Sequence, residues 1–118
     1  ANKLAVLLPG GGERLDSSSV LQAGRWHHIC CVHIQPTLEL FIDGRIDCSR
    51  TLSAHLPACD GPLLVGSLPS QMRDKAVSFA GHLTSLRWHG VALAKLEVAA
   101  LYARGPLVVP AALDDCWP

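Results

Sequence analysis

The sequence has little charge and no excess of either sign. Only 17% of its 118 residues are charged, with ten Lys and Arg against ten Asp and Glu, whereas an ordinary soluble domain has roughly 25%. A neutral chain lacks the basic surface that binds nucleic acid or anionic lipid, so we expect no nucleic-acid partner. With 49% hydrophobic residues, the chain is also too apolar to be disordered.

Long hydrophobic runs are missing too. A membrane span needs about 18 to 20 consecutive apolar residues, and here Pro9, the glycines at 10–12, Pro36 and Pro62 interrupt each candidate. We therefore expect no direct membrane insertion in this segment. The length fits one domain.

Familiar catalytic motifs are absent from the sequence. It contains neither a Gly-x-Ser-x-Gly nucleophile motif nor a His-Glu-x-x-His zinc motif, and the glycines at 10–12 lack the Lys-Ser/Thr of a phosphate loop. The adjacent pair Asp114 and Asp115 would point apart in an extended tail, unlike the carboxylates of a glycosidase. We expect no enzymatic activity and no cofactor.

The cysteines form an odd set, at positions 30, 31, 48, 59 and 116. At least one is therefore free, bound to a metal, or paired outside this chain. Cys48, on the predicted return strand of the hairpin, and Cys59, after it, are a possible local disulfide. The alternative is five reduced thiols in a cytosolic protein.

Short apolar runs separated by turn residues predict an antiparallel all-β domain. Asp43-Gly44 is a typical two-residue hairpin turn, and the strand before it places Leu38 and Leu40 on one face and Phe41 on the other. The expected strands are 3–8, 14–15, 26–34, 38–43, 45–52, 63–66 and 79–88.

One helix is expected, over residues 93–102. Leu93, Leu96 and Leu101 follow a helical spacing, with strong helix formers between them. Gly105 followed by Pro106 predicts the end of the helix.

Several of these segments, in this order, resemble laminin G-like and pentraxin-like domains. Those carrying the resemblance are Gly24-Arg25-Trp26-His27-His28-Ile29-Cys30, Leu38 to Arg45 with its Asp43-Gly44 turn, Gly61 to Gly66, Phe79-Ala80-Gly81 to Trp88, and Val91 to Tyr102. Together they cover roughly residues 20–106. Gly105-Pro106, the position of Cys30 and the Trp117-Pro118 ending favour the pentraxin branch.

The resemblance implies a two-sheet jelly-roll sandwich with one short C-terminal helix and with its early strands missing from this chain. The domain would occupy residues 1–106, and 107–118 would be a tail or linker. The remainder of the same protein would then supply the missing strands. Trp26, His28, Asp43, Gly44, Phe79 and Gly81 would be structural motif residues, with Trp26 anchoring the core between the sheets.

The resemblance also bears on disulfides and calcium. Cys30 matches a family cysteine that pairs with an earlier strand, which implies a disulfide to a residue outside this chain. Pentraxins bind calcium through a loop rich in Gln, Glu and Asp. Here the matching loop, after Gly66, offers only Asp74 as a carboxylate, so we expect no metal site of this type.

A zinc site is one hypothesis for the strand that begins at Trp26. His27, His28, Cys30, Cys31 and His33 are five potential ligands within seven residues. On a strand, however, three of them share one face and two the other, so four cannot converge on one ion. Structural histidines are the expected role.

Functionally, the resemblance implies a non-catalytic binding or adhesion module of a larger secreted or cell-surface protein, recognising a protein or glycan ligand through its loops. Loops 67–75 and 16–19 are the candidates, with Ser70, Gln71, Arg73, Asp74 and Lys75 as candidate binding residues. The basic residues Arg14, Arg25, Arg45 and Arg50 are dispersed in sequence, which favours a solvated rim over a heparin-binding patch. The alternative function is a structural scaffold domain in a large intracellular multidomain protein, and the lack of an Asn-x-Ser/Thr sequon favours it.

Overall fold

The fold consists of two antiparallel sheets and one helix. In the computed structural model the described residues are 2–8, 14–53, 65–66 and 79–105. Strands β1 (Ala5–Leu7) and β2 (Arg14–Asp16) form one sheet. Strands β3 (Ile29–Ile34), β4 (Thr37–Ile42) and β5 (Arg45–Thr51) form the other, and helix α1 (Lys95–Arg104) follows. The predicted all-β sandwich with a short C-terminal helix is confirmed.

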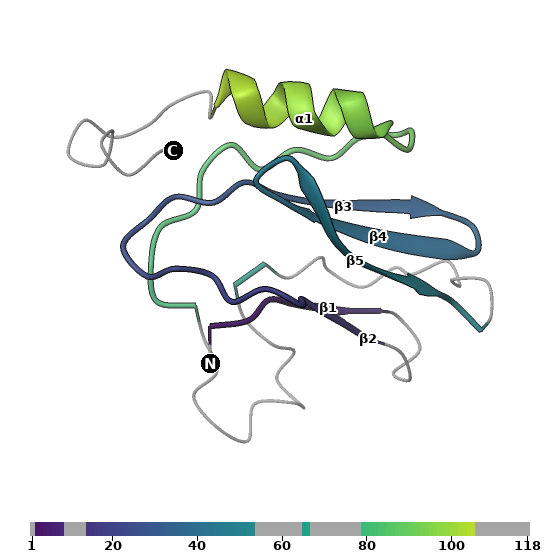
Figure 1. Ribbon diagram of the computed structural model, residues 1–118, viewed down its shortest axis with the longest axis horizontal. Helices are drawn as coiled ribbons and strands as arrows, with labels where there is room; N and C mark the ends of the chain where they lie inside the picture. The colour runs from purple at the N-terminus through teal and green to yellow at the C-terminus, as the bar shows by residue number, and fades with distance from the viewer. Residues whose placement is uncertain (1, 9–13, 54–64, 67–78, 106–118) are drawn as a thin grey trace.

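The three-stranded sheet is the middle layer of the molecule. Figure 1 shows α1 above it and β1–β2 below it. The two faces of β4 account for this order. Leu38 and Leu40 are buried with Leu15 and Leu52 on the side of β1 and β2, whereas Phe41 packs with Val32 and the helical residue Val98. The predicted alternation along this strand is confirmed.

The turn between β4 and β5 has the predicted two residues. Asp43 and Gly44 have φ angles of 52° and 81°, the pair of left-handed conformations that matches the twist of a hairpin. The register then changes within β5, because Phe41 pairs with Ile46 but Leu40 pairs with Cys48. Asp47 is the extra residue of this β-bulge.

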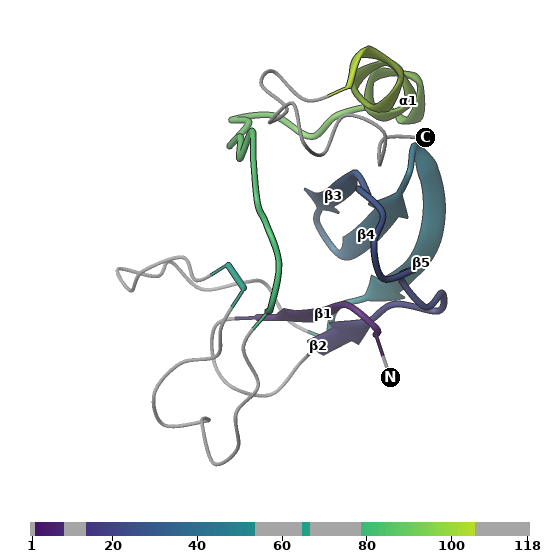
Figure 2. The same cartoon turned by 90° about the vertical axis from the view of Figure 1, so that its left-hand side faces the viewer.

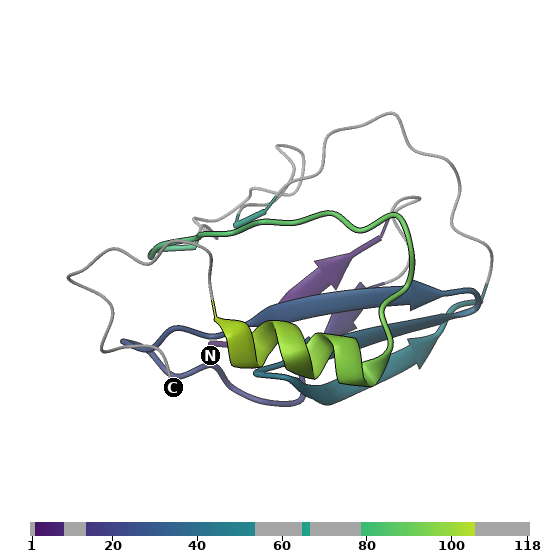
Figure 3. The same ribbon diagram turned by 90° about the horizontal axis from the view of Figure 1, so that it is seen from above.

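The strand predicted over 79–88 is wrong for the described residues. This segment is irregular, and Ser85 has a φ angle of 57°, which interrupts an extended backbone. Phe79 donates one backbone hydrogen bond to Gly66, at 2.7 Å. Figures 2 and 3 place the segment beyond β3, away from β4 and β5. An alternating pattern produces a strand only where a neighbouring strand pairs with it.

Other boundaries also differ from the predictions. Residues 65–66 form a bend rather than the end of a strand, and β3 begins at Ile29 rather than Trp26. Trp26 is half-buried and lies outside both core clusters of the described residues, so its role as an anchor of the core stays a prediction.

Helix α1 begins and ends two residues later than the predicted 93–102, and it stops at Gly105 as predicted. Glu97 accepts a hydrogen bond from the backbone N–H of Ala94 at 2.8 Å, which satisfies one free donor at the helix start. Gly105 has a φ angle of 80° and donates to the carbonyls of Leu101 and Tyr102. In the described part of the chain, no helix has the length and hydrophobicity needed to cross a membrane.

Candidate binding site

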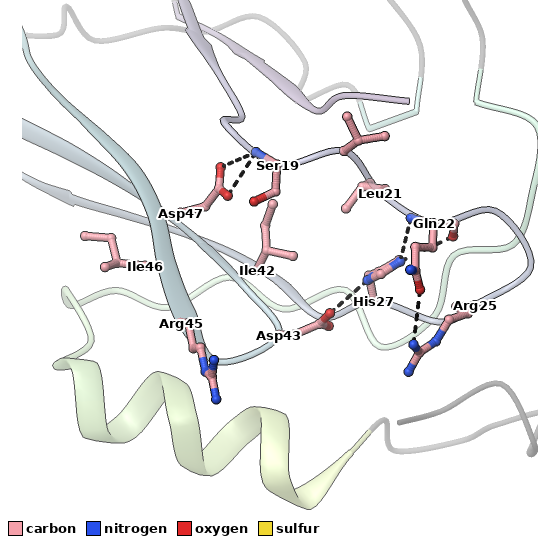
Figure 4. Close-up of a pocket in the computed structure, with 11 residues that line it drawn as sticks. Ser19, Leu21, Gln22, Arg25, His27, Ile42, Asp43, Arg45, Ile46 and Asp47 are labelled. Carbon is pink, nitrogen blue, oxygen red and sulfur yellow. Dashed lines mark hydrogen bonds and ion pairs between the residues drawn. The ribbon is translucent and has the colours of Figure 1, made fainter. Parts of the chain in front are cut away.

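A shallow hollow of about 390 Å³ lies where the loop after β2 passes the β4–β5 turn (Figure 4). We call it the hairpin hollow. Its lining combines polar, charged and aliphatic side chains, namely Ser19, Val20, Leu21, Gln22, Arg25, His27, Ile42, Asp43, Arg45, Ile46 and Asp47.

Asp43 organises the floor of the hairpin hollow. Its carboxylate accepts the backbone N–H of His28 through Oδ1 at 2.9 Å and contacts Nδ1 of His27 through Oδ2 at 2.8 Å. Nε2 of His27 accepts the backbone N–H of Gln22 at 3.1 Å. In the tautomer that lets Nε2 accept this N–H, Nδ1 donates to Asp43. The imidazole therefore connects the turn to the loop.

Asp47 fixes the other end of the same loop. From the bulge, its carboxylate accepts the backbone N–H groups of Ser18 and Ser19 at 2.6 and 3.1 Å. Partial burial acts to raise the pKa of Asp47, but the hydrogen bonds from Ser19 and Ser18 outweigh it and the net pKa is lowered. The carboxylate is thus ionised at neutral pH and serves to hold the loop.

The predicted loop 16–19 is largely structural. Ser17 is buried, and its Oγ accepts the N–H of Leu4 at 2.9 Å and donates to the carbonyl of Ser19 at 2.8 Å. Of these four positions only Ser19 lines the hairpin hollow. The other predicted loop, with Ser70, Gln71, Arg73, Asp74 and Lys75, lies outside the described residues.

Two arginines that are far apart in sequence line the same hollow. Arg25 donates to the side-chain oxygen of Gln22 at 3.1 Å, and the guanidinium of Arg45 has no hydrogen-bond partner within the described ranges. Aliphatic side chains belong to the same lining, of which Val20 is 55% exposed and Ile46 43% exposed. Sequence analysis predicted a dispersed basic rim, and the hairpin together with the loop brings these two side chains to one site.

We expect Asp43→Asn to destabilise the hairpin by about 1–2 kcal/mol, because a charge-assisted hydrogen bond to His27 is lost. Asparagine tolerates the left-handed backbone of this position and can still accept the N–H of His28. Chemical denaturation measures the change. Asp16→Asn, which removes only an exposed ion pair to Arg14, is the matched control with an expected loss below about 0.5 kcal/mol. Equal losses in the two variants would contradict the assignment.

His28 belongs to the opposite side of the turn, against α1. Its ring centroid lies 6.2 Å from that of Tyr102, and a Cβ built on Gly44 would lie 2.9 Å from the same tyrosine. Nδ1 of His28 is buried with no hydrogen-bond partner in the described part. Burial lowers the pKa of His28, Asp43 opposes this shift, and Arg87 adds to it. His28 and Gly44 thus help to seat the helix.

Acid should therefore weaken the docking of α1. The folded protein has a His28 pKa below the unfolded value of 6.5, so the unfolded chain binds more protons. The contribution of neutral His28 to the free energy of unfolding is complete above pH 6.5, and it is lost as the pH falls through the lowered pKa of the folded state. We expect His28→Phe to flatten this part of a stability–pH curve, whereas His33→Gln, at an exposed site, leaves it unchanged. An unaltered slope in His28→Phe would refute this role.

Phe79 and Gly81, which the resemblance implies are structural motif residues, lie against each other. A Cβ built on Gly81 would lie 2.6 Å from the Phe79 ring. Phe79 is nevertheless 54% exposed. The two residues lie in the segment before α1, and neither lines the hairpin hollow.

The cysteines of the described part are free thiols: Cys30, Cys31 and Cys48. Burial raises the pKa of each, and that of Cys31 reaches about 11, so all three are protonated and weakly nucleophilic at neutral pH. Cys31 and Cys48 flank Leu40 on the two neighbouring strands. They are roughly 10 Å apart, beyond disulfide reach. Cys59 lies outside the described residues, and the pairing of Cys30 stays a prediction.

Metal-ligating side chains do not gather in the described part. No group of three or more His, Cys, Asp or Glu residues is placed to hold an ion there. Cys30 pairs with Phe41 and Cys31 with Leu40, so neighbouring residues of β3 point to opposite faces.

Sequence reasoning missed the roles of Asp47 and Gln22. Asp47 reaches the loop because of the bulge, and nothing in the local sequence marks that change of register. Gln22 acts through its backbone as well as its side chain, and a backbone contact leaves no residue-specific signal. His27, expected at a structural rim, lines the hairpin hollow.

Comparisons with known proteins give one family and one solved structure. A laminin G family model described as the concanavalin A-like lectin/glucanases superfamily matches residues 1–99. An S-layer domain-containing protein from Clostridium thermocellum ATCC 27405 has a similar fold, with a TM-score of 0.58 and 23% sequence identity over 78% of this chain. The match covers 46% of that chain, so this chain spans less than half of its length. No curated protein sequence matches.

Proposed function

The chain belongs to the laminin G family of the concanavalin A-like lectin/glucanase superfamily, and from this premise we propose a non-catalytic binding module. The proposed ligand is a protein or a glycan, recognised at the hairpin hollow. Laminin G-like domains are generally binding modules, and such domains bind through loops held on a rigid sandwich.

The pre-organised loop carries this proposal. Both ends of the lining loop are fixed, by Asp47 at Ser18 and Ser19 and by His27 at Gln22. A loop that is already ordered loses little conformational entropy when a ligand binds. The exposed side chains between these two anchor points are then available for contact.

The chemistry of the hollow supports binding over catalysis. The carboxylates of Asp43 and Asp47 already accept hydrogen bonds from the turn and the loop. A general acid or nucleophile must instead present its atoms to the substrate.

We further propose that the domain belongs to a larger secreted or cell-surface protein, and that the remainder of the same protein pairs with the edge of β3. The similar fold in an S-layer domain-containing protein supports a surface location. Among the described residues β3 has a strand neighbour only in β4, and Leu86 and Trp88 of the 79–88 segment are 74% and 82% exposed. The same proposal includes three further points. The domain ends at residue 106, it belongs to the pentraxin branch, and Cys30 forms a disulfide with a residue outside this chain.

Blocking the hollow tests the proposed function. The full-length protein is assayed on arrays of oligosaccharides and synthetic peptides, as wild type and as Val20→Trp, which fills the hollow with a bulky ring. Val91→Trp makes the same change at a site that is 73% exposed and outside the hollow. We expect binding by the wild type and Val91→Trp and its loss in Val20→Trp. Binding that Val20→Trp leaves intact would contradict the proposal.

The three free thiols favour a second candidate function, an intracellular structural scaffold domain. Thiols persist in the reducing cytosol, whereas disulfides accumulate outside it. Alkylation of the native protein followed by intact-mass analysis separates the candidates. Modification of Cys30 without prior reduction supports the scaffold, and modification only after reduction supports the secreted module.

A further inference from the structure

We propose that the hairpin hollow binds an acidic peptide segment of a protein partner, whose carboxylates pair with Arg25 and Arg45. This inference rests on the proposed function and specifies its ligand.

The arginines of the hollow differ from those elsewhere on the sheet. Arg14 contacts Asp16 at 2.6 Å, and Arg50 donates to the carbonyl of Arg14 at 2.8 Å. Within the described residues the guanidinium of Arg25 donates to the neutral amide of Gln22 alone, and Arg45 has no ion-pair partner there. Figure 4 shows these two guanidinium groups on either side of the Asp43–His27 pair.

The lining holds two guanidinium and two carboxylate groups, and within the described residues neither carboxylate forms an ion pair with Arg25 or Arg45. Asp43 accepts from His27 and His28, and Asp47 accepts from Ser18 and Ser19. An incoming carboxylate therefore finds two guanidinium groups without having to displace an existing ion pair. Guanidinium–carboxylate hydrogen bonds are charge-assisted and among the stronger polar contacts of proteins.

The apolar part of the lining favours a peptide over a glycan. It consists of Val20, Leu21, Ile42 and Ile46, and the eleven lining residues include no Trp, Tyr or Phe. Sugar rings pack best on flat aromatic faces, which this lining lacks, whereas aliphatic side chains suit the aliphatic side chains of a peptide. A ligand with acidic and aliphatic residues in turn matches both features.

Selection from a random peptide library tests the inference. Phage-displayed peptides are selected on the full-length protein, and the tightest peptide is then measured by fluorescence anisotropy. We expect at least threefold enrichment of Asp and Glu, and an affinity that falls as salt is added. Arg25→Gln and Arg45→Gln should each weaken binding about tenfold. Arg104→Gln, which removes the same charge from the last turn of α1, should leave it unchanged.

The outcomes separate this inference from the proposed function. Selected peptides without acidic enrichment, or equal weakening by Arg104→Gln, overturn the acidic-peptide inference. Tighter binding of an oligogalacturonate than of the selected peptide also overturns it, because the carboxylate then comes from a glycan. If Val20→Trp abolishes binding while both glutamine variants keep it, the proposed function stands and the inference fails. If Val20→Trp leaves binding intact, the proposed function itself fails.

Discussion

Replacing Phe41 with alanine is expected to lower the free energy of unfolding by about 3–5 kcal/mol. Phe41 is 1% exposed and lies between Val32 of β3 and Val98 of α1. Its removal leaves a cavity at the contact that joins the helix to the sheet. A loss of this size is a large share of the about 5–15 kcal/mol by which domains are stable.

Chemical denaturation followed by tryptophan fluorescence measures this loss, and Phe79→Ala is its matched control. The same atoms are removed there from a ring that is 54% exposed, so the expected loss is below about 1 kcal/mol. If the two variants lose equal stability, Phe41 does not occupy the core position described here.

Replacing Gly44 with alanine is expected to cost about 2–3 kcal/mol, from two effects that add. The φ angle of 81° is unfavourable for a residue with a Cβ. That Cβ would also lie 2.9 Å from Cδ2 of Tyr102, so the tyrosine and with it the end of α1 must shift. The midpoint of thermal unfolding and the helical circular dichroism signal report both changes.

Gly24 offers a control that separates the two effects. Its φ angle is 79°, but a Cβ there would meet nothing within 4 Å, so Gly24→Ala tests backbone strain alone, at about 1 kcal/mol. Combining Gly44→Ala with Tyr102→Ala should recover the part of the loss that comes from the clash. Equal losses for Gly44→Ala and Gly24→Ala would show that Tyr102 does not rest on the turn.

The parts of the fold that were predicted are those with a local cause. Asp43-Gly44 specifies its own hairpin because both residues tolerate a positive φ. The alternation of Leu40 and Phe41 follows from the pleat of a strand, and Gly105 ends α1 because it adopts a conformation that other residues avoid.

The parts that were not predicted depend on partners distant in sequence. The 79–88 segment has strand-like composition, but a strand also requires a neighbour, which the described residues do not supply. The hairpin hollow depends on the bulge at Asp47 and on the contact of His27 with Gln22. Arg25 and Arg45 are candidate ligand-binding residues only because the fold brings them to one site.

The central claim is that the hairpin hollow is the recognition surface of this domain. Hydrogen–deuterium exchange of the full-length protein, measured by mass spectrometry with and without a selected acidic peptide, tests it most directly. The account predicts slower exchange over residues 19–25 and 43–47 when the peptide binds, and unchanged exchange over 95–104. Slower exchange confined to other segments, with 19–25 and 43–47 unaffected, would contradict it.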